Sequence, residues 1–145
     1  MDKDRLSSLY GHWIIAESVS FHLVTSLRSH PSFHLSTEHS RRVWQSLLYV
    51  VVEGYQTLNL RDAVIDAILD DAGQVQKLRR FRNATFHHQE DPLSAKYWDF
   101  KADPDSELWV VKLNAAFRSF FERELPDHPL SDYLCNLSEA KRSGK

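Results

Sequence analysis

The stretch from Val43 to Leu58, "VWQSLLYVVVEGYQTL", decides the fold class. Its three consecutive valines, residues 50–52, favour a strand by intrinsic propensity. The apolar positions of the whole stretch nevertheless recur every three or four residues, at Val43, Trp44, Leu47, Leu48, Val51, Tyr55 and Leu58. That spacing is typical of an amphipathic helix, and burial in a core overrides local propensity. We therefore predict a long helix here, after a polar start at residues 36–38.

Helical spacing also extends on both sides of this stretch. It predicts a first helix from Asp4 to about Arg28, which ends near His30-Pro31 because a residue before proline avoids the helical region. After the second helix, Asn59 and Asp62 provide the cap of a third segment. Gly73 interrupts this segment, and the spacing resumes over residues 75–85, as one bent helix or as two pieces.

The rest of the chain begins with a predicted loop over residues 89–103, in which Tyr97, Trp98 and Phe100 contact the body of the protein. Asp103-Pro104 then has the pattern of an N-cap followed by proline at the first helical position, and the helix that it opens stops at Pro126. Residues 130–137 suggest a short further helix, and the end of the chain is expected to fray.

The composition agrees with a helical protein of one domain. Only 4 glycines and 5 prolines occur in 145 residues, which disfavours a fold rich in turns. We predict an all-α, up-down bundle of four to five helices that forms a single domain over residues 1–145. Its core lies at about residues 4–125, and residues 126–145 hold the short helix and the tail.

Charge and cysteine content bound the function. The formal net charge of −2 gives no overall basic field, so binding to nucleic acid would need a local basic patch. The single cysteine, Cys135, excludes an intrachain disulfide. Residues 1–13 lack the apolar stretch of a signal peptide, and the longest apolar run, residues 47–52, is too short to cross a bilayer. We expect a cytoplasmic protein with no membrane contact.

No metal-binding motif occurs among its histidines, and we expect no metal and no cofactor.

The chemistry concentrates in "LRRFRNATFHHQ", residues 78–89, which combines three arginines with an asparagine and two adjacent histidines. Histidine titrates near neutral pH and suits a general base or acid, whereas arginine stays charged and suits a phosphate group. Together they match cleavage of RNA by attack of the ribose 2′-hydroxyl, for which we assign His87 as base or acid and Arg82 as the stabilising cation. On a regular helix Asn83 lies on nearly the same face as His87, so it can orient the imidazole or bind phosphate.

Three further sets of residues support this candidate site. Glu53 is a carboxylate on an apolar helix and needs a partner, for which we predict Arg82. His88 is a weaker candidate beside His87, and Arg79 and Arg80 can bind backbone phosphates of RNA. A second copy of the chain across a two-fold axis would bring two arginines and two histidines together.

The segment Arg82-Asn83-Ala84-Thr85-Phe86-His87 resembles the signature of the higher eukaryotes and prokaryotes nucleotide-binding (HEPN) domains. That signature is an arginine, four to six residues and a histidine, often with an asparagine directly after the arginine. The resemblance implies a helical bundle, a homodimer with its cleft at the motif, and in many members a metal-independent ribonuclease. It also implies a toxin or defence role, frequently beside a nucleotidyltransferase-type antitoxin.

Two other hypotheses share this fold. In the first, the chain is a catalytically inactive HEPN-like module that binds a protein partner or a nucleotide. In the second, Arg82 pairs with a carboxylate and His87 caps a helix end, which leaves a purely structural bundle. On that second hypothesis Glu53 simply emerges at the end of its helix beside Gly54.

Overall fold

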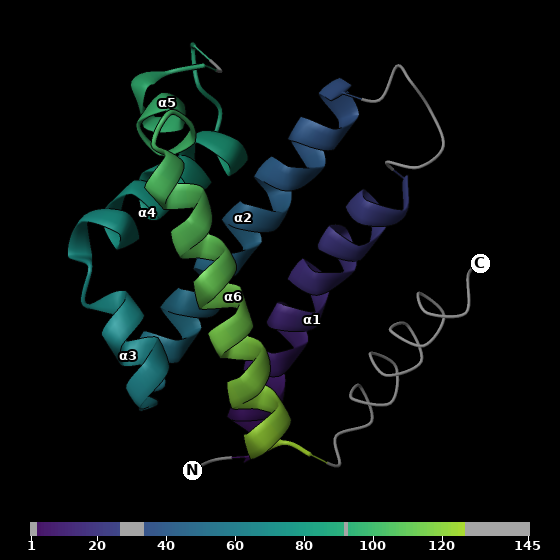
Figure 1. Ribbon diagram of the computed structural model, residues 1–145, viewed down its shortest axis with the longest axis vertical. Helices are drawn as coiled ribbons and strands as arrows, with labels where there is room; N and C mark the ends of the chain where they lie inside the picture. The colour runs from purple at the N-terminus through teal and green to yellow at the C-terminus, as the bar shows by residue number, and fades with distance from the viewer. Residues whose placement is uncertain (1–2, 27–33, 92, 127–145) are drawn as a thin grey trace.

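The computed structural model describes residues 3–26, 34–91 and 93–126. These ranges hold no strand and six helices, which are α1 (Lys3–Ser26), α2 (His34–Thr57), α3 (Ala63–Leu69), α4 (Ala72–Phe86), α5 (Ala95–Lys101) and α6 (Pro104–Glu124) (Figure 1). The all-α prediction is confirmed, with one or two helices more than predicted. The expected end of the first helix near His30-Pro31 and the short helix at 130–137 fall outside the described residues.

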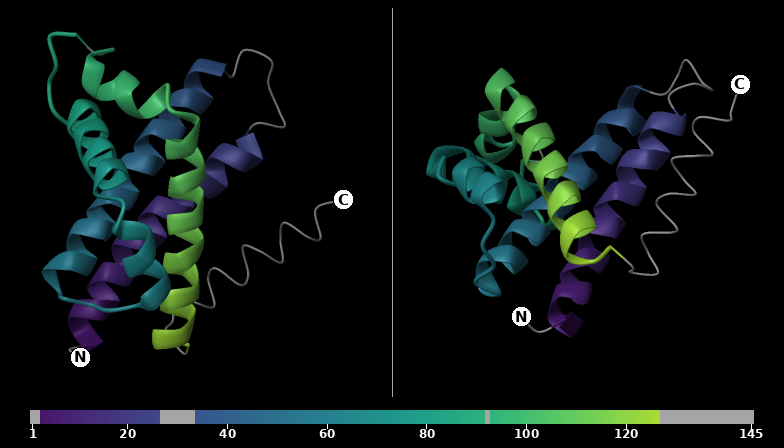
Figure 2. Two further views of the ribbon diagram at one scale, coloured as in Figure 1. Left: turned by 60° about the vertical axis from the view of Figure 1, so that its left-hand side comes forward. Right: turned by 60° about the horizontal axis from the view of Figure 1, so that its bottom comes forward.

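The two longest helices, α1 and α2, run antiparallel beside each other, and α6 lies across them (Figures 1 and 2). Polar contacts join α6 to α1: the Trp13 indole donates to the side-chain Oδ1 of Asn114 at 3.0 Å, and the Asn114 side-chain amide donates to Glu17 Oε1 at 2.7 Å. Arg118 also pairs with Glu17, which is buried. A buried carboxylate is stable only when it is paired in this way.

The valines of α2 are helical, as predicted, and Val51 and Val52 are fully buried. They belong to one apolar cluster to which all six helices contribute. Burial of this surface outweighs the strand propensity of the three valines.

The region between α2 and α4 departs from the prediction in two details. Asn59 does not cap a helix but turns the chain in the left-handed region, at φ 52°. Asp62 alone caps α3, where its side chain accepts from the backbone N–H groups of Val64 and Ile65. The break before α4 lies at Asp71, which caps α4, so Gly73 belongs to the first turn of that helix and does not interrupt it.

The predicted loop over residues 89–103 contains a helix, α5. Phe100 of α5 is buried, and its ring centroid lies 4.7 Å from that of Phe81 on α4. Tyr97 also stacks on Phe81, at 5.5 Å, whereas Trp98 remains half exposed. Two of the three aromatic side chains therefore pack as expected, but on a helix.

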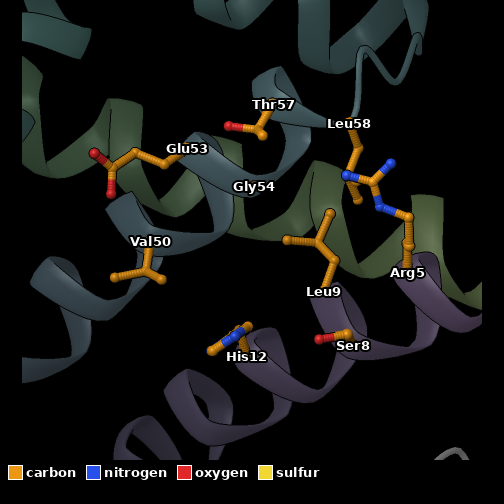
Figure 3. A pocket seen from close by; sticks show the side chains of 9 residues that line it. All are labelled: Arg5, Ser8, Leu9, His12, Val50, Glu53, Gly54, Thr57 and Leu58. Atoms are coloured by element: carbon orange, nitrogen blue, oxygen red, sulfur yellow. The ribbon is translucent and has the colours of Figure 1, made fainter.

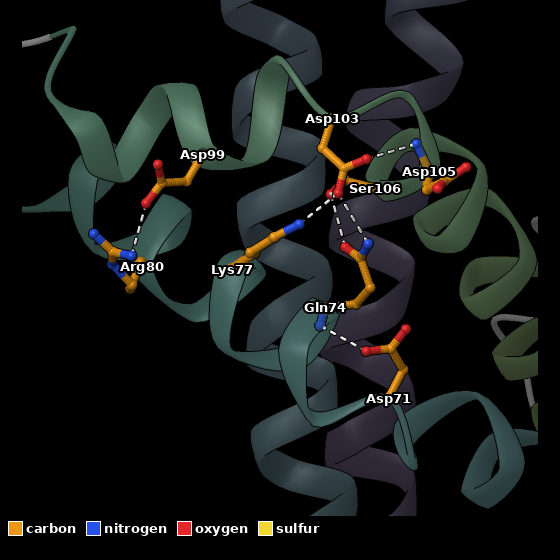
Figure 4. Close-up of polar contacts among 8 residues, drawn as sticks. All are labelled: Asp71, Gln74, Lys77, Arg80, Asp99, Asp103, Asp105 and Ser106. Carbon is orange, nitrogen blue, oxygen red and sulfur yellow. Dashed lines mark hydrogen bonds and ion pairs between the residues drawn. The ribbon is translucent and has the colours of Figure 1, made fainter.

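Asp103 opens α6 as its N-cap, as predicted, and accepts from the Asp105 N–H at 3.0 Å. Its other oxygen accepts from Lys77 at 2.5 Å, Gln74 at 3.1 Å and Ser106 at 3.1 Å (Figure 4). The hydrogen bond from Lys77, followed by those from Gln74 and Asp105, lowers the pKa of Asp103 well below its ordinary value. These hydrogen bonds connect the N-terminal part of α4 to the start of α6.

Among the described residues, no helix combines the length and the apolar character needed to span a bilayer.

Candidate functional site

The candidate motif lies at the C-terminal end of α4. Arg82 and Asn83 are on the helix, which ends at Phe86. His87 is the C-cap residue, with φ −109° and ψ 145°, and its N–H still donates to the Asn83 carbonyl at 3.1 Å. Because the backbone leaves the helix at His87, its imidazole does not follow the helical angle on which the predicted pairing with Asn83 depended.

Arg82 forms the predicted ion pair with Glu53 of α2, at 3.4 Å between Nη2 and Oε2. Its Nη1 donates to the Asn83 side-chain oxygen at 3.0 Å, so Asn83 contacts the guanidinium and not the imidazole of His87. The Arg82 Nε is buried and has no hydrogen-bond partner among the described residues. Glu53 and Asn83 therefore hold the arginine against α2.

The other two arginines of the motif region differ in their surroundings. Arg79 is exposed, and Arg80 pairs with Asp99 of α5 at 2.7 Å (Figure 4). Burial, and then the charge of Glu53, raise the pKa of Tyr49, whereas Arg79 and Arg82 act in the opposite direction. Two cationic side chains thus act together where α4 meets α2, while the charge of Arg80 is already matched by Asp99.

A hollow of about 370 Å³ lies at the end of α4, and we call it the histidine hollow; it is lined by His39, Arg42, Val43, Ala84, Thr85, His87, His88 and Gln89. The three imidazoles are exposed and have no hydrogen-bonding or ionic partner among the described residues. Arg82 is not part of this lining. In one protomer, therefore, the predicted arginine and histidine face different surroundings.

Arg42 fixes the geometry of the histidine hollow. Its Nε donates to the Thr85 hydroxyl at 3.0 Å and its Nη2 to the Ala84 carbonyl at 2.5 Å. The guanidinium also lies over the Tyr97 ring, 4.8 Å from its centroid. Carbonyl groups at a helix C-terminus lack intrahelical donors, and a cation there is favourable. Arg42 thereby joins α2 to the end of α4.

The sequence interpretation missed His39 and Arg42. Both lie on α2, at least forty positions before Arg82, and no sequence signal links them to His87. Only the packing of α2 against α4 brings them together.

A second hollow, of about 350 Å³, lies between α1 and α2 (Figure 3), with a lining of Arg5, Ser8, Leu9, His12, Val50, Glu53, Gly54, Thr57 and Leu58. We call it the α1–α2 hollow. A Cβ on Gly54 would come within 2.4 Å of the Leu9 side chain, so the missing side chain lets the two helices approach. Because Glu53 lines this hollow, the Arg82 ion pair borders it.

Each hollow has a lining residue on the same face of α2. Val43 lines the histidine hollow and Val50 lines the α1–α2 hollow. Residues seven apart on a helix point in nearly the same direction and are about 10 Å apart. Leu47 lies between them on this side and is partly buried, as are the two valines. The two halves of the candidate site are thus neighbours on one surface.

Comparisons with protein-family models, with curated proteins and with solved structures found no match for this chain. The HEPN resemblance therefore depends on residues 82–87 and the helical fold. Two features, the pairing of Arg82 with Glu53 and the position of His87 at a helix end, are also those of the purely structural bundle. The three exposed imidazoles around one hollow are not required by that hypothesis, and imidazole is the side chain that most often serves as a general acid or base.

Proposed function

We propose that this chain is a HEPN-like, metal-independent endoribonuclease that acts as a homodimer through Arg82, Asn83 and His87. The observation that carries the proposal is the exposed imidazole of His87 in a hollow that it shares with His39, His88 and Arg42. An imidazole without a partner is free to accept or donate a proton, and a cavity of this size accommodates a nucleotide.

In the proposed reaction His87 removes the proton of a ribose 2′-hydroxyl. The 2′-oxygen then attacks the adjacent phosphorus, the bond to the 5′-oxygen breaks, and the 5′-oxygen takes a proton from a general acid or from water, which gives a 2′,3′-cyclic phosphate and a 5′-hydroxyl end. Negative charge builds on the phosphate oxygens during this step, and a fixed guanidinium stabilises it. We assign that role to Arg82, which Glu53 and Asn83 hold in place.

A second copy of the chain is needed to complete this site. In one protomer the Arg82 ion pair borders the α1–α2 hollow, while His87 lines the histidine hollow. A two-fold axis near Leu47 would set each hollow of one copy against the other hollow of its partner. The contact would cover Val43, Leu47 and Val50, together with Phe86, which is 46% exposed one turn after Arg82.

The first test is cleavage of labelled RNA in EDTA by the wild type, His87→Ala and Arg82→Ala. We expect the wild type to cut and each variant to lose most of its activity. Arg61→Ala and His22→Ala, which change exposed residues elsewhere, serve as matched controls and should cut normally. Cutting that survives both motif substitutions would eliminate the proposed site. RNA that the wild type binds without cutting would instead support the inactive binding module.

A mixing experiment tests the shared site. If Arg82 of one copy acts with His87 of the other, a heterodimer of the two inactive variants contains one intact site. Coexpression of Arg82→Ala with His87→Ala chains should then restore about a quarter of the wild-type activity, because half of the dimers are mixed and each has one of two sites. No recovery in dimers shown to be mixed would contradict a site built from two chains.

The dimer surface has its own test. Phe86→Glu places a charge in the proposed contact, so it should yield a monomer and lose cleavage. Leu108→Glu is the matched control, since Leu108 is 54% exposed on α6, and it should leave the mass in solution unchanged. A wild-type protein that is monomeric at assay concentrations yet cuts RNA would refute this arrangement.

A further inference from the structure

We propose that His39 is a second catalytic histidine, which protonates the leaving 5′-oxygen while His87 accepts the 2′-proton. This inference depends on the proposed ribonuclease function and adds a residue outside the arginine, asparagine and histidine pattern. His39 lies near the start of α2, is exposed, and lines the same hollow as His87.

The position of His39 distinguishes it from His88. One wall of the histidine hollow comes from α2, with His39, Arg42 and Val43, and the other from residues 84–89 at the end of α4. In this reaction the attacking and leaving oxygens stand on opposite sides of the phosphorus, so base and acid must approach from opposite sides. His39 belongs to the wall opposite that of His87, whereas His88 is the neighbour of His87 in the chain and belongs to the same wall.

Arg42 holds the two walls at a fixed separation. It follows His39 by three residues on α2, and its hydrogen bonds to Ala84 and Thr85 reach across the hollow to the end of α4. The Ser46 hydroxyl adds a bond of 2.9 Å to Thr85. A general acid and base act efficiently only when such contacts fix their geometry. Arg42 also contributes a positive charge to the lining of the hollow, which favours binding of an RNA phosphate.

The proton balance of the step is simple. His87 begins neutral and takes the proton from the 2′-hydroxyl, and His39 begins protonated and gives its proton to the 5′-oxygen as the phosphorus–oxygen bond breaks. The cyclic phosphate and the 5′-hydroxyl leave without a net proton change in the protein. Exchange with water then restores the starting state of both imidazoles.

The test compares RNA with uridine 3′-(4-nitrophenyl phosphate), whose nitrophenolate leaves without being protonated. His39→Ala should lower RNA cleavage by about 10²-fold or more and leave cleavage of the nitrophenyl ester nearly unchanged, because only the general acid is missing. His87→Ala should lower the cleavage of both substrates. His22→Ala, which removes an exposed histidine of α1 outside this hollow, is the matched control and should have little effect on either.

Each result has one meaning. If the wild type cuts RNA and His39→Ala cuts it equally well, His39 is not the acid, and the ribonuclease proposal stands. If His39→Ala loses both substrates in parallel, His39 shapes the hollow and donates no proton, which also overturns the inference. If the wild type cuts neither substrate, the ribonuclease function itself fails. Circular dichroism should show the same helix content in all the variants, since the three histidines are exposed.

Discussion

Polar side chains gather at both ends of α4, but their contacts differ. At the N-terminal end, Lys77, Gln74, Asp103 and Ser106 satisfy one another, and Asp71 caps the helix (Figure 4). At the C-terminal end three imidazoles line a hollow without a partner among the described residues. The first end is a closed network, and the second leaves reactive groups open to solvent.

This difference separates stability from function along one helix. Polar groups that satisfy each other stabilise a structure and have nothing left for a ligand. Groups left without partners contribute little to folding, and in natural proteins they concentrate at functional sites. Substitutions at the two ends of α4 should therefore change different properties.

The largest expected effect is on activity, at the C-terminal end. His87→Ala should reduce RNA cleavage by about 10² to 10⁴-fold, the usual contribution of a general base or acid. Its melting temperature should stay near that of the wild type, because exposed side chains contribute about 0.5 kcal/mol or less to stability. Initial rates and thermal melts of the same preparation measure both quantities. A large drop in melting temperature would show that His87 is structural.

The next effect is on stability, at the N-terminal end. Asp103→Ala removes the N-cap of α6 and the acceptor for Lys77, Gln74 and Ser106. We expect the melting temperature to fall by about 3–8 °C, while cleavage per folded molecule remains unchanged. Differential scanning calorimetry and rate assays well below the melting temperature test the two statements. If Asp103→Ala also loses cleavage activity at temperatures where it is still folded, the two ends of α4 do not act independently.

The stability that Asp103 provides at the N-terminal end of α4 should depend on pH. Hydrogen bonds from Lys77, Gln74 and the Asp105 N–H lower the pKa of Asp103 in the folded state. The resulting stabilisation is complete above the ordinary aspartate pKa of about 3.9 and is lost as the pH falls through the lower folded value. The difference in melting temperature between the wild type and Asp103→Asn should therefore be constant above about pH 5 and shrink in more acidic buffer. A difference that does not change with pH would contradict this origin.

The sequence predicted what depends on local patterns. The helical character of the valine stretch in α2 follows from its periodic flanks, and the start of α6 follows from Asp103-Pro104. The Glu53–Arg82 pair followed from the cost of an isolated carboxylate on an apolar helix. These predictions required no knowledge of how the helices pack.

What the sequence did not predict depends on tertiary contacts or weak signals. The sequence of α5 shows no clear apolar periodicity, and its N-cap Ser94 makes no side-chain capping bond. The exit of His87 from α4 occurs without a glycine or proline at the helix end. His39 and Arg42 reach the candidate site only because α2 packs on α4, which no short motif encodes.

The smallest expected effect is that of a substitution at Glu53. This residue belongs neither to the closed network at the N-terminal end of α4 nor to the histidine hollow at its C-terminal end. Its side chain is 43% exposed and that of Arg82 27% exposed, and ion pairs this close to solvent contribute about 0–1 kcal/mol. Glu53→Gln removes the charge that fixes Arg82, so cleavage should fall by no more than about fivefold. Glu122→Gln, on the exposed side of α6, is the matched control and should change neither rate nor melting temperature. A loss as large as that of Arg82→Ala would mean that Glu53 takes part in the reaction itself, because weaker positioning of the arginine cannot account for so much.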